Sequence, residues 1–212
     1  MVRSTVVPLA VCVLVAVPTA SAVKGAGRQA ASAPVGEVIE WSKDARLSKD
    51  SFKATAPAVA VATAHGWVGL EVEWECREDK PISHARAVFD PAQSWWRSAA
   101  EGNLWGTVDV DSMSRSQLEN RRTLAEREAD LLRHEQLHFD LTELAARKIR
   151  QQLDGLQKAC ETPGATADIE QAINDIEHGW MDEQAAYDKQ TGHGTNLVRQ
   201  RQWELRVRRA LQ

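Results

Sequence analysis

The sequence predicts an α+β protein in which an N-terminal antiparallel β-sheet packs on a C-terminal helical part. Two observations lead to this fold class. Between residues 58 and 89, apolar and polar side chains alternate, which is the period of strands that bury one face. From about Ser114 onward, apolar residues recur every three or four positions, which is the period of helices that bury one stripe. The 212 residues suffice for one domain with its own core.

The N-terminus has the pattern of a secretory signal peptide. Arg3 precedes an apolar run from Val6 to Val17, and Ala20-Ser21-Ala22 is a small-residue cleavage site. The run is short for a membrane span, so an uncleaved anchor is the weaker alternative. We therefore predict a signal peptide over residues 1–22 and an exported protein, periplasmic or secreted, without stable membrane insertion after cleavage. Residues 23–35, rich in Ala, Gly and Ser, are predicted to form a flexible leader.

The domain proper is predicted to span residues 36–212 and to begin with a short strand at residues 37–41. A Val-rich strand at residues 58–64, a turn at His65-Gly66, an alternating strand from Val68 to Cys76 and another strand at residues 82–89 complete a sheet of three or four strands. The glutamates between the apolar residues of the third strand, at positions 71, 73 and 75, indicate a solvated face.

Residues 90–112 are predicted to form a connection with a short helix. Trp95, Trp96 and Trp105 lie in it, and aromatic residues in such a segment are more often parts of the core than ligand binders. In a protease, the same segment would form one wall of the cleft.

Three helices follow, at about residues 116–158, from near Thr166, and from about Asn196 to the C-terminus. In the first, His134 and His138 fall on the stripe of leucines, so they face inward. In the second, Tyr187 shares an apolar stripe with isoleucines and also faces inward.

The long helix carries the motif His-Glu-x-x-His. His134 and His138 lie one turn apart on one face, where both imidazoles can bind one metal ion, and Glu135 stands beside them as a candidate general base. A catalytic zinc ion takes three protein ligands and keeps one position for water. The motif supplies two ligands, and Glu143 points to the opposite face of the helix.

The third ligand is therefore expected from a later segment. We favour His193, because Gly192 and Gly194 let the backbone approach an ion, with Asp188 or Glu183 as runners-up. Tyr187 is the best candidate to donate a hydrogen bond to the oxyanion of the transition state.

Removal of a signal peptide leaves two cysteines, Cys76 and Cys160. The even count in an oxidising compartment predicts one disulfide between them, the alternative being two separate buried thiols.

Two sequence blocks resemble a known family. The run 134–140, His-Glu-Gln-Leu-His-Phe-Asp, is followed by Glu143, and the run 187–194 reads Tyr-Asp-Lys-Gln-Thr-Gly-His-Gly. Both resemble the bacterial "domain of unknown function 922" family, described as secreted zinc-dependent proteases, and Glu40-Trp41 and Ser94-Trp95 look similar too. The resemblance runs from about residue 37 to the C-terminus and implies that Tyr187, Asp188, Thr191 and His193 share a site with the two motif histidines. Leu137 stands where the family has Gly, off the metal-facing side.

Two functions are consistent with these patterns. The first is a secreted zinc metalloendopeptidase of zincin-like fold, a hydrolase that cleaves a peptide or protein substrate with Glu135 as general base. The second is a non-catalytic zinc-binding module of the envelope or exterior. A site closed by four protein ligands, His134, His138, His193 and Asp188, would favour the second. A metal-free interaction domain is a weaker third. The mild acidity of the chain, a formal net charge of −4, gives no reason to expect nucleic acid as a partner.

Overall fold

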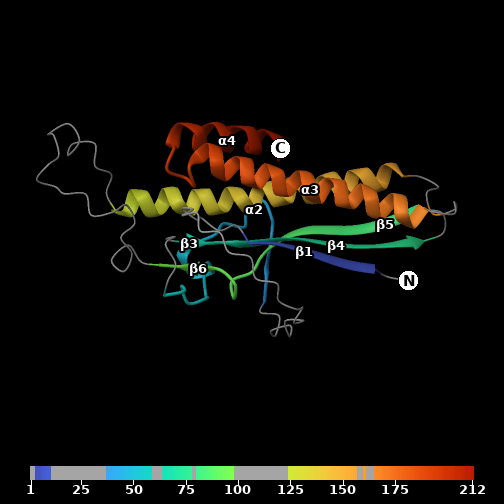
Figure 1. The fold of residues 1–212 in the computed structure, drawn as a ribbon, viewed down its shortest axis with the longest axis horizontal. Coiled ribbons are helices and arrows are strands. Elements are labelled where there is room, and N and C mark those ends of the chain that lie inside the picture. The colour runs from blue at the N-terminus through green and yellow to red at the C-terminus, as the bar shows by residue number, and fades with distance from the viewer. Residues whose placement is uncertain are drawn as a thin grey trace, which may run out of the picture.

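The computed structural model describes residues 3–10, 37–58, 64–77, 80–97, 124–156, 160 and 165–212. These residues form an α+β fold in which a four-stranded antiparallel sheet is covered by the first of three long helices (Figure 1). The predicted fold class, a sheet followed by helices, is confirmed.

The sheet has the strand order β1-β4-β5-β2, with every neighbouring pair antiparallel. Its members are Arg3–Ala10 (β1), Trp67–Arg77 (β4), Lys80–Phe89 (β5) and Ile39–Glu40 (β2). Along β4, Leu70, Val72 and Trp74 are buried, whereas the glutamates between them are exposed or half-buried. The predicted solvated face is confirmed.

Strand β1 falls inside the predicted signal peptide. Its eight residues pair with β4 from Arg3↔Trp74 to Ala10↔Trp67, at the edge of the sheet. An edge position tolerates Pro8, whose missing N–H would interrupt a central strand. The signal peptide and its removal stay predictions, because a strand in the full chain does not decide whether the segment is later cleaved.

A second, two-stranded sheet joins Ala64–His65 (β3) to Trp95–Trp96 (β6), near a short 3-10 turn at Lys49–Ser51 (η1). Two predictions were wrong here. His65-Gly66 is not a turn, because Gly66 links β3 directly to β4. Residues 95–96 are strand rather than loop or helix. Trp95 is buried, as expected of a core residue. Trp105 and most of the predicted strand at 58–64 lie outside the described residues.

The helices are Leu124–Gly155 (α2), Ala165–Thr191 (α3) and Leu197–Ala210 (α4). Helix α2 packs on β5 and β4, and α3 and α4 pack on α2 (Figure 1). All three predicted helices are confirmed, although α2 ends at Gly155 rather than near residue 158. Residues 116–123, its predicted first turns, lie outside the described part of the chain. Among the described helices, none is both long and apolar enough to cross a membrane.

Two apolar clusters hold the helices in place. The larger fills the space between the sheet and the helices and includes Leu70, Phe89 and Phe139. The smaller joins α2, α3 and α4 through Leu137, Leu141, Tyr187, Trp203 and Val207. His134 and His138, on the same helix as both clusters, have no exposed surface.

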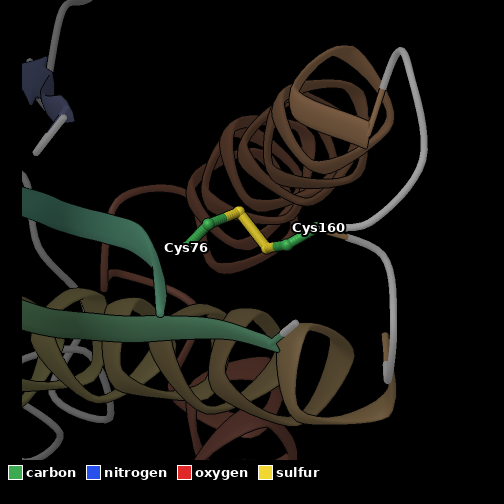
Figure 2. Close-up of a disulfide and its surroundings, with 2 residues drawn as sticks. All are labelled: Cys76 and Cys160. Carbon is green, nitrogen blue, oxygen red and sulfur yellow. A yellow bond between two sulfur atoms is a disulfide. The ribbon is translucent and has the colours of Figure 1, made fainter. Parts of the chain in front are cut away.

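The disulfide between Cys76 and Cys160 is present, as predicted (Figure 2). It ties the end of β4 to the connection between α2 and α3, with a Cα–Cα distance of 5.8 Å that is usual for such bonds. The bond therefore joins the sheet to the helical layer at two points 84 residues apart in sequence.

Candidate metal centre

Four side chains meet where the middle of α2 faces the end of α3. The Oδ1 atom of Asp188 lies 3.1 Å from Nε2 of His134 and 3.0 Å from Nε2 of His138, and the two Nε2 atoms are 3.1 Å apart. The Nδ1 atom of His193 lies 3.4 Å from the same Asp188 oxygen. Ligand atoms of His134, Asp188 and His193 all lie within 4.8 Å of one another.

His193 reaches the cluster because the chain reverses after α3. Gly192, His193 and Gly194 have φ values of 53°, 53° and 81°. Such a left-handed run is easy for glycine and strained for histidine. The His193 N–H donates to the Asp188 carbonyl, 3.0 Å away. This hydrogen bond holds His193 close to the last turn of α3. Flanking glycines were the sequence feature that suggested His193.

Gly194 also lets this turn lie against α2. A Cβ atom at position 194 would stand 3.0 Å from Cβ and 3.1 Å from Cγ of His134. Thr191, which the resemblance placed in the site, supports the turn rather than the cluster: its hydroxyl donates to the Tyr187 carbonyl at 2.8 Å and accepts from the Gly194 N–H at 3.3 Å.

Hydrogen bonds on the outer side of the rings fix which histidine nitrogen faces the cluster. Nδ1 of His138 lies 2.5 Å from Oε1 of Gln184, whose Nε2 donates to the His138 carbonyl and to Thr142. Because that amide is oriented by its own donors, His138 donates through Nδ1, and the neutral ring therefore presents an unprotonated Nε2 to the cluster. Nδ1 of His134 faces Oε1 of Gln200 in the same way, at 3.4 Å.

The resulting group fits a metal ion. With Nδ1 protonated, two Nε2 lone pairs and a carboxylate oxygen face one another at 3.0–3.1 Å, an arrangement that needs a cation or shared protons between them. Around a tetrahedral zinc ion with bonds of about 2.0–2.1 Å, ligand atoms stand about 3.3–3.4 Å apart. The buried Nδ1 of His193 has no hydrogen-bond partner, as expected of a ligand atom.

The close approach of these charged and polar groups also shifts their pKa values. Burial lowers the pKa of His134 to about 4. Burial also opposes protonation of His138, but the Asp188 carboxylate, together with Glu135 and Gln184, outweighs it and raises the pKa of that ring. The Asp188 carboxyl has a lowered pKa despite its burial, because both histidines hydrogen-bond to it.

Glu135 lies on the neighbouring face of α2, with 1% of its surface exposed. Its Oε2 accepts a hydrogen bond from the Gly66 N–H at 3.1 Å, and its Oε1 is buried without a partner. Burial raises the pKa of the Glu135 carboxyl to about 7. A carboxylate with one oxygen held and one free has the protonation equilibrium of a general base at neutral pH.

Tyr187 is buried, as the sequence predicted, and the hydrogen-bond partners of its hydroxyl are Gln200 and a backbone carbonyl. The hydroxyl donates to Oε1 of Gln200 at 2.7 Å, beside the His134 carbonyl at 3.3 Å, while the ring stacks on His134 with centroids 4.7 Å apart. Tyr187 thus supports His134. Its predicted catalytic role as an oxyanion donor stays a prediction, and this geometry does not favour it.

Of the runner-up ligands, Asp188 lies in the cluster and Glu183 does not. Glu183 pairs with Arg206 at 2.6 Å and with Lys148 at 3.7 Å, on another face of α3. Glu143 pairs with Arg147 and Arg150, in keeping with its exclusion as a ligand.

Three supporting residues were missed. Gln184 precedes Asp188 by one helical turn, and Gln200 shares an apolar stripe with Trp203 and Val207. A buried glutamine on such a stripe is a recognisable signal. Gly66 carries no signal in the sequence, because its contact with Glu135 joins residues 69 positions apart.

No curated protein and no solved structure matches the chain. One family does, over residues 49–194, a span that takes in the sheet, α2, α3 and the His193 turn. By that match the chain belongs to the family described as "Bacterial protein of unknown function (DUF922)".

Proposed function

We propose that this protein is an exported zinc-dependent endopeptidase with a zincin-like arrangement of its site. The observation that carries the proposal is Glu135, a buried carboxylate with one unpartnered oxygen, adjacent in sequence to a cluster of three imidazoles and a carboxylate. A buried carboxylate oxygen without a hydrogen-bond partner costs stability, and a purely structural metal site would gain nothing from having one beside it.

His134, His138 and Asp188 would hold the ion. Their atoms are the most deeply buried of the four, and the two histidines present Nε2 to the same Asp188 oxygen at 3.0 and 3.1 Å. His193 stands on the outer side, with 28% of its side chain exposed against 14% for Asp188. The metal proposed is zinc, because two or three imidazoles and one carboxylate are a donor set that zinc takes in catalytic sites.

The roles of the chain's own groups follow from their positions. A zinc ion in this site would lower the pKa of a bound water and polarise a carbonyl. Glu135 would take a proton from the attacking water through its free Oε1 and pass it to the leaving amine. The Gly66 N–H would hold the other oxygen still. Gln184 and Gln200 would keep the two imidazoles in the tautomer that ligation requires.

The test is metal content and peptide cleavage of the purified chain, with Glu135→Gln as the matched control. We expect about one zinc per chain in both proteins and cleavage of a broad fluorogenic peptide library only by the wild type. The glutamine has the size of glutamate and cannot accept the proton, so the control separates chemistry from folding. A protein that takes up no zinc would refute the metal site, and cleavage by both proteins would remove Glu135 from the chemistry.

A second function, a non-catalytic zinc-binding module, is favoured by one observation. All four predicted ligand side chains converge, and four protein ligands close a zinc site. In that case both proteins would bind zinc, neither would cleave any peptide in the library, and cobalt in place of zinc would show the intense visible absorption of a four-coordinate site without a response to added anions.

A further inference from the structure

A groove of about 1020 Å³ lies between α2, α4 and residues 41–46. None of the four candidate ligands lines it, but Gln200, which faces Nδ1 of His134, does, so the groove adjoins the metal centre without including the ligands. We propose that this groove is a docking site for an extended polypeptide segment that carries both acidic and apolar side chains. The proposal does not depend on peptidase activity.

The groove is basic although the chain as a whole has a net charge of −4. Its cationic side chains outnumber its carboxylates by six to three, the cations being Lys43, Arg46, Arg133, Arg147, Arg201 and Arg208. The carboxylates are already occupied. Asp140 accepts from Trp41 at 2.8 Å, Asp130 pairs with Arg133, and Glu204 pairs with Arg201 at 3.1 Å.

Three of the cations remain available. Lys43, Arg46 and Arg208 are exposed, and within the described ranges no carboxylate forms an ion pair with any of them. They come from two different elements that line the groove, two from the segment before η1 and one from α4. Carboxylates of a bound segment would therefore meet positive charge from both elements, and arginine can bind each one through two hydrogen bonds.

Apolar side chains lie among these charges, and they decide between a peptide and a uniform polyanion. Trp41, Leu137, Leu197 and Leu211 line the groove, with 39% of Leu197 exposed. Such surfaces take up aliphatic or aromatic side chains, which a nucleic acid backbone or a layer of lipid headgroups does not offer.

The wall before η1 is held in place before any partner arrives. The Trp41 indole donates to Asp140, the Leu47 N–H donates to Gln136 at 2.8 Å, and the Arg147 guanidinium lies over the Trp41 ring at 5.4 Å. A wall fixed to α2 in this way reduces the ordering cost of binding.

The experiment is fluorescence anisotropy with the full chain carrying Glu135→Gln, so that no probe is cleaved. The probes are a short dye-labelled peptide of glutamate, leucine and serine, and the same peptide with lysine in place of glutamate. We expect saturable binding of the acidic probe only, weakened by added salt. Arg46→Glu with Arg208→Glu should weaken it about tenfold or more, because two attractive contacts become repulsive.

The matched control is Arg209→Glu, an exposed residue next to Arg208 on α4 that does not line the groove. It makes the same charge change and should alter the affinity less than about twofold. Lys43→Glu, in the segment before η1, should weaken binding on its own. Equal binding of both probes would overturn the proposal. So would a loss of affinity with Arg209→Glu as large as that of the double variant. Tighter binding of duplex DNA or anionic vesicles, lost in the double variant, would assign the groove to a polyanion instead.

Discussion

Replacement of Gly66 by alanine tests how Glu135 is held. The Gly66 N–H donates to Glu135, and a Cβ atom at position 66 would stand 2.5 Å from Oε2 of that side chain and 3.3 Å from Cε2 of Phe89. The usual contact distance is about 3.4 Å or more, so the carboxylate must retreat by about 1 Å. Phe89 belongs to the core and cannot yield as easily.

The contact sets the expected loss of both stability and reaction rate. Overpacking at a buried position costs about 1–3 kcal/mol, which for a chain of this length lowers Tm by several degrees. A displacement of about 1 Å in a catalytic group can lower the rate about a hundredfold. We therefore expect Gly66→Ala to bind zinc like the wild type, to melt at a lower temperature, and to lose most of its peptidase activity through kcat rather than KM.

The assay compares zinc content, thermal melts and peptide cleavage for wild type, Gly66→Ala and the control Gly179→Ala. Gly179 lies in α3 with nothing within 4 Å of an added Cβ, so its replacement should be neutral or stabilising. Glu135→Asp shortens the side chain by one methylene and should restore part of the stability lost in Gly66→Ala. Full activity in Gly66→Ala, or additive losses in the double variant, would refute the contact. The stability measurements on the two single variants and the double variant test the contact even if no peptide is cleaved.

The remaining predictions concern the supports of the site and the disulfide. Tyr187→Phe removes the hydrogen bond to Gln200 and keeps the ring on His134. It should therefore cost about 1 kcal/mol in stability and change the cleavage rate by no more than a few-fold. A loss of about a hundredfold or more in kcat would instead support Tyr187 as the oxyanion donor. Gln184→Ala should weaken zinc binding about 10–100-fold, measured by competition with a chelator; unchanged affinity would show that the tautomer of His138 is fixed by something else. A free-thiol assay on the unfolded mature protein should find none, and Cys76→Ser with Cys160→Ser should lower the free energy of unfolding by up to about 4–5 kcal/mol, given the 84-residue separation.

How much of the site could be predicted from the sequence depended on how far apart along the chain the contacting residues lie. His134 and His138 follow from helical spacing alone, and the inward face of Tyr187 from the same rule. The convergence of α2 with the end of α3 was predicted from the missing third ligand, from the glycines around His193 and from the resemblance, not from periodicity. The contact of Gly66 with Glu135 depends on where β3 passes into β4 above α2. No local pattern records that, which is also why His65-Gly66 was misinterpreted as a turn.

The choice between the two proposed functions depends on His193. Of the four converging side chains it is the most exposed, it has a positive φ, and it is held through a turn rather than a helix. If one ligand gives way to water, it is therefore this one, and release of the ring would also relieve backbone strain. With three ligands sufficient, His193→Ala should keep zinc at moderately reduced affinity and keep its peptidase activity. With a closed structural site, the same change should greatly weaken zinc binding and destabilise the chain. A variant that binds zinc and cleaves would leave His134, His138 and Asp188 as the ligand set. A variant that binds none would make His193 a true ligand, as first favoured from its flanking glycines.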